Sequence, residues 1–208
     1  DPAAPGWLHE PAPPAPRLPM PVAPTALGGA KVIGAPVPEN LPDADPQAAM
    51  LLGTRLHLLL EHLPDRPRGD WPALAREVLA DAEGGLPEDP ALDGLLVEAA
   101  AVVDAPDLAQ VFQLPEDAQV LTEVALAAPL PGIGMLAGNV DRLVVMPDRV
   151  LAIDYKSNSE IPATPGDTPT GILRQLGAYR DALRLIYPAR RVQAAVLWTR
   201  TRSLMWLP

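Results

Sequence analysis

The chain has 208 residues, a formal net charge of −10 and no cysteine. That length accommodates one domain and a tail, and the lack of cysteine excludes disulfides, thiolate zinc sites and cysteine-ligated iron–sulfur clusters. No apolar run reaches 18 residues and no signal-peptide pattern is present, so we expect a soluble, cytoplasmic protein with no membrane partner.

Residues 1–46 contain 13 of the 28 prolines. Proline has no backbone N–H and a fixed φ, so this segment cannot form a long helix or a central strand. We expect a linker, or an arm laid along a surface, that joins a domain at residues 47–208 to sequence upstream. The chain begins with Asp1 and not with Met, so we expect it to be a piece of a longer protein.

The first predicted helix begins at Asp45-Pro46, with Asp as N-cap and Pro at the first helical position, and runs to about Leu63. A glycine inside a helix costs about 1 kcal/mol relative to alanine. Gly53 therefore indicates that another segment approaches the helix backbone closely. His57 lies one turn later and is a candidate metal ligand or phosphate contact, although a lone histidine on an apolar helix is more often a core residue.

Residues 64–115 form a predicted helical insertion, with helices over about 71–82 and 90–103 and no evident chemistry. A strand is expected over 119–127, followed by a turn at 129–134. Glu123 lies among apolar neighbours in that strand, where a buried carboxylate is costly unless it is paired or bound to a metal. A glutamate at a sheet edge facing water is an equally good interpretation.

Residues 133–156 predict a β-hairpin with a two-residue loop at Pro147-Asp148. Such a loop places Asp141 opposite Asp154, with Cβ atoms about 4.5–5.5 Å apart, and Lys156 on the same face as Asp154. Carboxylates that close repel unless a shared proton, a basic neighbour or a divalent cation compensates them. The alternative is an ion pair on a solvated hairpin face, which the apolar setting VLAIDYK disfavours.

A helix is expected over residues 170–188, and strands over 192–198 and 202–207. Gln175 and Tyr179 are four residues apart and therefore share one face of the helix. They are either hydrogen-bonding groups beside a site or a surface pair on an amphipathic helix. The order of elements predicts an α/β fold with a mixed β-sheet flanked by helices.

The charge is unevenly distributed along the chain. Residues 149–208 contain 9 Lys and Arg against 4 Asp and Glu, a net +5, which leaves −15 for residues 1–148. The overall charge argues against simple DNA binding. A basic C-terminal third is nevertheless compatible with DNA on one side, because phosphate contacts carry most non-specific DNA affinity. The alternative is that these arginines are only surface residues of a helix and of strand ends.

Four short segments, GTRLH, NVDRL, IDYKS and QLGAY, occur in that order. Together they resemble the motifs of RecB-like PD-(D/E)xK nucleases, and their order looks closest to the C-terminal nuclease domain of AddA-type helicase–nuclease subunits. The resemblance covers about residues 52–198 and implies a restriction-endonuclease-like α/β core. The first motif reads Val140-Asp141 in place of the family's Pro-Asp.

The resemblance implies a site for Mg²⁺ or Mn²⁺. Its ligands would be Asp141, Asp154, His57 and the backbone carbonyl of Tyr155, with Glu123 as an auxiliary ligand.

Three further residues would act on the substrate. Lys156 would orient the attacking water and stabilise charge on the phosphate. Gln175 and Tyr179 match the family's QxxxY helix and would hydrogen-bond the phosphate or hold Lys156 and the water.

The implied function is metal-dependent hydrolysis of DNA by an exodeoxyribonuclease that belongs to an ATP-dependent helicase–nuclease in double-strand-break repair by homologous recombination. Its partners would be single-stranded DNA ends from unwound duplex, the helicase part upstream and a second, AddB-like subunit. One alternative is a non-catalytic nuclease-fold scaffold or DNA-binding module, which the intact Asp/Asp-x-Lys set disfavours. The other is a stand-alone RecB-like exonuclease, which the proline-rich arm disfavours weakly.

Overall fold

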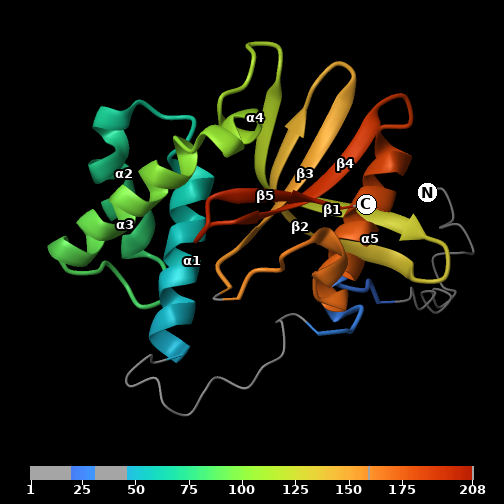
Figure 1. The fold of residues 1–208 in the computed structure, drawn as a ribbon, viewed down its shortest axis with the longest axis horizontal. Coiled ribbons are helices and arrows are strands. Elements are labelled where there is room, and N and C mark those ends of the chain that lie inside the picture. The colour runs from blue at the N-terminus through green and yellow to red at the C-terminus, as the bar shows by residue number, and fades with distance from the viewer. Residues whose placement is uncertain (1–19, 31–45, 159, 208) are drawn as a thin grey trace, which may run out of the picture.

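A computed structural model of the chain describes residues 20–30, 46–158 and 160–207. A five-stranded sheet lies between a group of helices on one face and a single long helix on the other (Figure 1). The helices are α1 (Pro46–His62), α2 (Trp71–Ala80), α3 (Asp89–Val103), α4 (Ala109–Phe112) and α5 (Thr170–Ile186). The strands are β1 (Gln119–Leu130), β2 (Gly134–Val145), β3 (Arg149–Lys156), β4 (Arg191–Trp198) and β5 (Ser203–Trp206).

The sheet order follows the chain order, β1-β2-β3-β4-β5. All neighbouring strands are antiparallel except β3 and β4, which run parallel because α5 carries the chain across the sheet between them. The restriction-endonuclease-like α/β core with a mixed sheet and flanking helices is thereby confirmed. The turn expected at 129–134 is shorter than predicted, because β1 continues to Leu130 and pairs Pro129 with Met135. β1 is an edge strand, where proline is tolerated.

Two hydrophobic cores cover the two faces of β3, which explains its nearly uninterrupted apolar sequence. Leu151, Ile153 and Tyr155 belong to the core shared with α1, α2 and α3, which we call the helical-side core. Val150 and Ala152 belong to the core beneath α5, which we call the α5-side core. By the same alternation, Asp154 projects toward α5.

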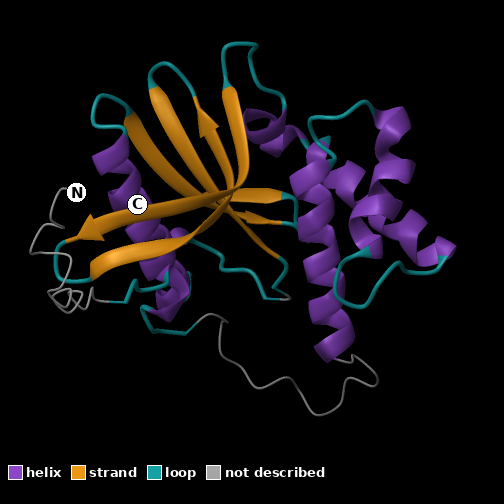
Figure 2. Cartoon of the chain, turned by 180° about the vertical axis from the view of Figure 1, so that it is seen from behind, coloured by secondary structure: helices purple, strands orange, loops and turns teal. Residues whose placement is uncertain are grey.

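The helical insertion is attached to the sheet through a buried arginine. Arg142 of β2 is fully buried and donates to Asp65, with its Nη2 atom 3.1 Å from Oδ1, and through Nε to the backbone carbonyl of Val111 at 3.2 Å. Its guanidinium lies 5.0 Å from the ring centroid of Phe112. One side chain thus joins β2 to α4 and to the loop after α1. Seen from behind, these helices form a separate layer beside the sheet (Figure 2).

Part of the proline-rich segment packs on the domain. Val22 exchanges backbone hydrogen bonds with the β2 residues Met135 and Ala137 at 2.8 and 3.0 Å. The backbone N–H of Gly171, in the first turn of α5, donates to Ala30 at 2.7 Å. Residues 20–30 therefore run along β2 and the start of α5. Residues 1–19 and 31–45, which make up the rest of the predicted arm, lie outside the described residues, and the division of the chain at residue 46 stays a prediction.

β1 and β2 share a local break at Glu123 and Asp141. Both residues are omitted from a ladder that is otherwise continuous on either side of them. Glu123 has φ +45°, in the left-handed region that non-glycine residues rarely adopt. Val140 and Leu143 lie in the same α5-side core although they are three residues apart, so the side-chain alternation of β2 changes phase here. The break releases Asp141 from regular alternation.

Among the described helices, none has the length and hydrophobicity to cross a lipid bilayer.

Candidate active site

The carboxyl end of β3 carries a buried ion pair. Asp154 is only 2% exposed, and its Oδ2 atom lies 2.5 Å from the Nζ atom of Lys156. The side-chain amide of Gln175 on α5 donates to the other oxygen, Oδ1, at 2.8 Å. Lys156 remains partly exposed. A carboxylate and an ammonium group are thus fixed at the point where the sheet opens to solvent.

Asp141 lies where β2 and β3 separate. The two-residue loop at Pro147-Asp148 forms as predicted, and the ladder runs from the Val145–Val150 pair to the Arg142–Ile153 pair. The ladder ends at that pair. Beyond it, the Oδ2 atom of the Asp141 side chain accepts a hydrogen bond from the backbone N–H of Tyr155 at 2.6 Å. Burial, followed by the nearby charge of Asp154, raises the pKa of Asp141 to about 7.

His57 reaches the same place from the opposite face of the sheet. Its ring stands edge-on to that of Tyr155, with centroids 5.7 Å apart. Burial and the charge of Lys156 lower the pKa of His57 to about 4, so the imidazole is neutral at physiological pH.

The glycine one turn earlier explains how α1 comes so close. A Cβ atom on Gly53 would lie 2.5 Å from the Oγ atom of Ser157, the residue after Lys156. The close approach inferred from a helical glycine is therefore present, and the segment that approaches is the end of β3.

Tyr179 and Glu123 lie at the border of this group. The Tyr179 hydroxyl donates to the backbone carbonyl of Asn139 at 2.5 Å, and burial raises the pKa of Tyr179 to about 12. Glu123 is exposed and accepts a 3.3 Å hydrogen bond from the side-chain amide of Asn139. Its charge contributes to the raised pKa of Asp141. Glu123 is thus near the carboxylates but faces solvent.

The residues around Asp141 and Asp154 fit a hard divalent cation. The buried Asp154 carboxylate is paired with one ammonium group, that of Lys156, and the half-buried Asp141 carboxylate lies near both. Desolvation and then the charge of Asp154 raise the pKa of Asp141. The Tyr155 carbonyl points to the same side of β3 as its N–H, toward the gap that β2 leaves. Oxygen donors of this kind suit Mg²⁺ or Mn²⁺, and a neutral imidazole is the form that binds metals. In the described part of the chain, no three His, Cys, Asp or Glu side chains form a ready-made metal cluster.

Three residues near the site were not singled out from the sequence. Arg142 follows Asp141 and anchors β2 in the helical-side core. Asn139 contacts both Tyr179 and Glu123. Glu61 lies one helical turn after His57, and burial raises its pKa. The four-residue spacing from His57 could have identified Glu61, whereas the roles of Arg142 and Asn139 depend on contacts distant in sequence.

The group combines the parts needed for hydrolysis of a phosphodiester. Buried oxygens at the sheet end can hold a cation, and the Lys156 ammonium beside them can stabilise negative charge on a phosphate oxygen. Gln175, on α5, fixes the orientation of Asp154 through its side-chain amide. All of these groups are on rigid strands and helices.

Comparisons with known proteins identify the family of this chain. The family model described as the PD-(D/E)XK nuclease superfamily matches residues 31–204. The solved structure titled "Crystal structure of SSO0001" has 14% sequence identity to the chain, covers 78% of each of the two chains and gives a TM-score of 0.32. No curated protein matches the chain. Because the family model spans most of the chain, the protein is a member of the PD-(D/E)XK nuclease superfamily.

Proposed function

We propose that this chain is a metal-dependent DNA nuclease and that Asp141, Asp154 and Lys156 carry its chemistry. The observation that supports this most directly is that the buried Asp154 and the half-buried Asp141 lie together where β2 and β3 separate, with Lys156 paired to Asp154. A structural ion pair needs one carboxylate, and the second is costly to bury unless a cation or a proton compensates it. Membership of a nuclease superfamily supports the same conclusion.

Each residue has a defined part in the proposed reaction. Asp141, Asp154, His57 and the Tyr155 carbonyl would hold Mg²⁺ or Mn²⁺, with Glu123 as an outer, auxiliary group. When bound, such a cation supplies Lewis acidity toward a phosphate oxygen and a water of lowered pKa.

The remaining residues act on the substrate and on the ligands. Lys156 would stabilise charge that develops on the phosphate oxygens and orient the attacking water. Gln175 would hold Asp154 in place, and Tyr179 would keep β2 against α5 through Asn139.

We also propose a setting for this activity. The order GTRLH, NVDRL, IDYKS, QLGAY and the proline-rich residues 1–46 resemble the nuclease end of AddA-type helicase–nucleases. The substrate would then be single-stranded DNA ends produced by an upstream helicase, in a cytoplasmic complex with an AddB-like subunit that repairs double-strand breaks by homologous recombination. The proposed roles of the site residues concern the metal, the phosphate and the water, and none concerns a base edge, so we expect little sequence preference.

The experiment is degradation of linear single-stranded DNA with Mg²⁺ or Mn²⁺ by this chain, beside the Lys156→Gln variant. Cleavage by the parent chain that is lost in the variant is the expected result. Metal-dependent cleavage that persists in the variant would overturn the assignment of Lys156. If neither chain cleaves, either alone or mixed with a helicase and its partner subunit, the domain is a nuclease-fold scaffold and not an enzyme.

A further inference from the structure

A second polar feature lies on the α5 side of the sheet, away from the carboxylates. It is a groove of about 440 Å³ between the end of α5, the turn that follows it and the start of β4. Four arginines, Arg180, Arg184, Arg190 and Arg191, line it. The chain contains 16 Lys and Arg in total, so a quarter of its basic residues border one groove. We call it the arginine groove.

The arginine groove is separate from the candidate active site. Its β4 residues include Arg191 and Val192, which pair with the start of β3, whereas Lys156 pairs with Trp198 at the other end of β4. Six residues of extended strand between Val192 and Trp198 correspond to roughly 20 Å. Both features nevertheless lie on the face that α5 covers, because Val192 and Trp198 share the α5-side core.

The groove carries an excess of positive charge. Asp181 is ion-paired with two of the arginines, with its Oδ1 atom 3.2 Å from Nη1 of Arg184 and 3.8 Å from Nε of Arg180. No carboxylate lines the groove among the residues that the structure describes. The guanidinium group of Arg190 lies 5.4 Å from the centroid of the Tyr187 ring, which orients this side chain. The lining itself therefore carries a net positive charge that an anion would neutralise.

The composition of the groove favours a phosphodiester backbone. The arginine rim supplies planar, always charged donors that match phosphate oxygens in pairs. The lining also contains the apolar residues Val192, Ala194 and Leu207 and the polar residue Gln193. Arginines beside apolar side chains suit a strand that presents phosphates on one side and sugars or bases on the other.

We propose that the arginine groove binds the backbone of single-stranded DNA at a distance from the phosphate that is cut. The inference rests on the proposed DNA nuclease function and adds a second DNA contact to it. In a chain with a net charge of −10, a concentrated basic surface offsets the repulsion between DNA and the rest of the protein.

The test uses the 208-residue chain and a labelled oligothymidylate of about 16 nucleotides, with binding measured by fluorescence anisotropy in EDTA at several salt concentrations. The Arg184→Gln/Arg190→Gln variant keeps two of the three methylenes of each side chain and removes two charges. Each phosphate contact on a single strand contributes about 0.7 to the slope of log K against log salt. We expect the slope to fall by roughly 1.4 and the affinity on the order of tenfold.

A matched control removes charge elsewhere. Arg76 is on α2 in the helical insertion and is ion-paired with Asp89 at 2.8 Å. Arg68, just before α2, is ion-paired with Asp104. Arg76→Gln/Arg68→Gln makes the same change in net charge, and its slope should equal that of the parent chain. Equal affinities and slopes for the groove and control variants would overturn the proposal. If the groove variant has a lower Tm than the parent, the exposed single variant Arg191→Gln should still reduce the slope by about 0.7.

Two further measurements separate the possible failures. When the cleavage rate is measured against DNA concentration with Mg²⁺ or Mn²⁺, the groove variant should keep kcat, because the carboxylates are untouched, and raise KM, because a DNA contact is lost. If DNA binding depends on the groove arginines but the chain does not cleave DNA, the groove proposal holds and the proposed nuclease function is wrong. If the chain cleaves DNA but binding does not depend on the groove arginines, the nuclease function holds and the groove proposal is wrong. If poly-glutamate binds as tightly as DNA through the same arginines, the groove is a docking site for acidic protein segments, and the DNA proposal is wrong.

Discussion

The carboxylate of Asp141 accepts the backbone N–H of Tyr155 at 2.6 Å, one position beyond the last ladder pair of β2 and β3. A side chain has therefore taken the place of a main-chain partner at the point where the two strands diverge. This holds one carboxylate in the plane of the sheet while Asp154 projects toward α5, so the two approach a common point from different directions.

The Asp154→Asn substitution removes the charge and keeps an oxygen that can accept the hydrogen bond from Gln175. We expect metal-dependent cleavage to fall by about a thousandfold or more, since metal-assisted charge stabilisation contributes several kcal/mol, while Tm in EDTA is maintained. The matched control is Asp148→Asn in the exposed turn of the same hairpin, which should cleave normally. Activity retained in Asp154→Asn would remove Asp154 from the proposed metal site.

Replacing Lys156 by methionine should separate stability from chemistry. It leaves the buried Asp154 carboxylate without its cation, and breaking a buried pair in this way costs up to about 3–5 kcal/mol. We expect a lower Tm in EDTA that saturating Mn²⁺ partly restores, because the metal replaces the lost charge. Lys156→Arg keeps the charge and should keep Tm. A Lys156→Met protein as stable as the parent in EDTA would show that the pair contributes nothing to folding.

The metal-free domain should show two opposite pH dependences of stability. Asp141 has a pKa raised to about 7, so the stability that it contributes is present at low pH and is lost as pH rises through 7. His57 has a pKa lowered from 6.5 to about 4, so its contribution is present above pH 6.5 and is lost as pH falls through 4. Each group contributes a slope of at most about 1.4 kcal/mol per pH unit.

Single substitutions separate these two effects in urea unfolding in EDTA. As pH rises from 4 to 7, the parent chain loses stability because Asp141 must ionise in the folded state. Asp141→Asn lacks this ionisation, so its stability relative to the parent chain should increase over the same pH range. Relative to the parent chain, His57→Gln should gain stability as pH falls from 6.5 to 4. Parallel pH profiles for all three proteins would mean that neither group is perturbed by its surroundings.

The contact between residues 20–30 and α5 predicts a destabilising Gly171→Ala change. A Cβ atom on Gly171 would lie 2.7 Å from the Ala30 carbonyl oxygen and 2.8 Å from that of Gly29. Both atoms are backbone, so the segment must move, and overpacking of this kind costs about 1–3 kcal/mol. Gly177 is on the same helix with open space where its Cβ would be, so Gly177→Ala should stabilise the domain by up to about 1 kcal/mol.

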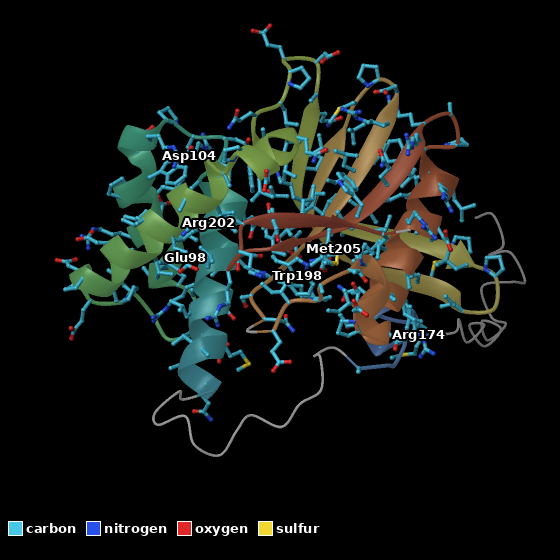
Figure 3. The ribbon with its side chains drawn as sticks, viewed as in Figure 1. Glu98, Asp104, Arg174, Trp198, Arg202 and Met205 are labelled. Atoms are coloured by element: carbon cyan, nitrogen blue, oxygen red, sulfur yellow. The ribbon has the colours of Figure 1, made fainter. Side chains whose placement is uncertain are left out.

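Urea unfolding and limited proteolysis measure this difference. In the Gly171→Ala protein, protease should cut within residues 20–30 faster than in the parent chain, whereas Gly177→Ala should leave that rate unchanged. Equal stabilities for the two alanine variants would show that residues 20–30 do not pack on α5 in solution. Figure 3 marks a second point of the same contact, Arg174, whose guanidinium donates to the Leu27 carbonyl at 3.2 Å.

The hairpin was predictable because its determinants are local. Alternation in VLAIDYK and the turn residues Pro147-Asp148 set the register of β2 and β3, and the structure has that register up to Arg142. Gly53 was informative for a similar reason, since a glycine in a helix has few explanations other than a close neighbour.

The break at Glu123 and Asp141 could not be read from the sequence. It depends on a left-handed φ at a glutamate and on a hydrogen bond from the neighbouring strand, neither of which leaves a periodic signal. Regular alternation predicts a continuous hairpin in which Asp141 faces Asp154 directly. A strand arginine is also ordinarily expected at the surface, so the full burial of Arg142 was not foreseen.

Asp141 and Arg142 are consecutive, yet one belongs to the candidate active site and the other anchors the helical insertion through Asp65 and Val111. His57 comes from the same insertion side. A chain in which the helices have not yet docked therefore lacks both the imidazole and a fixed position for the first carboxylate. The proposed active site is therefore complete only in a molecule whose helices have docked on the sheet.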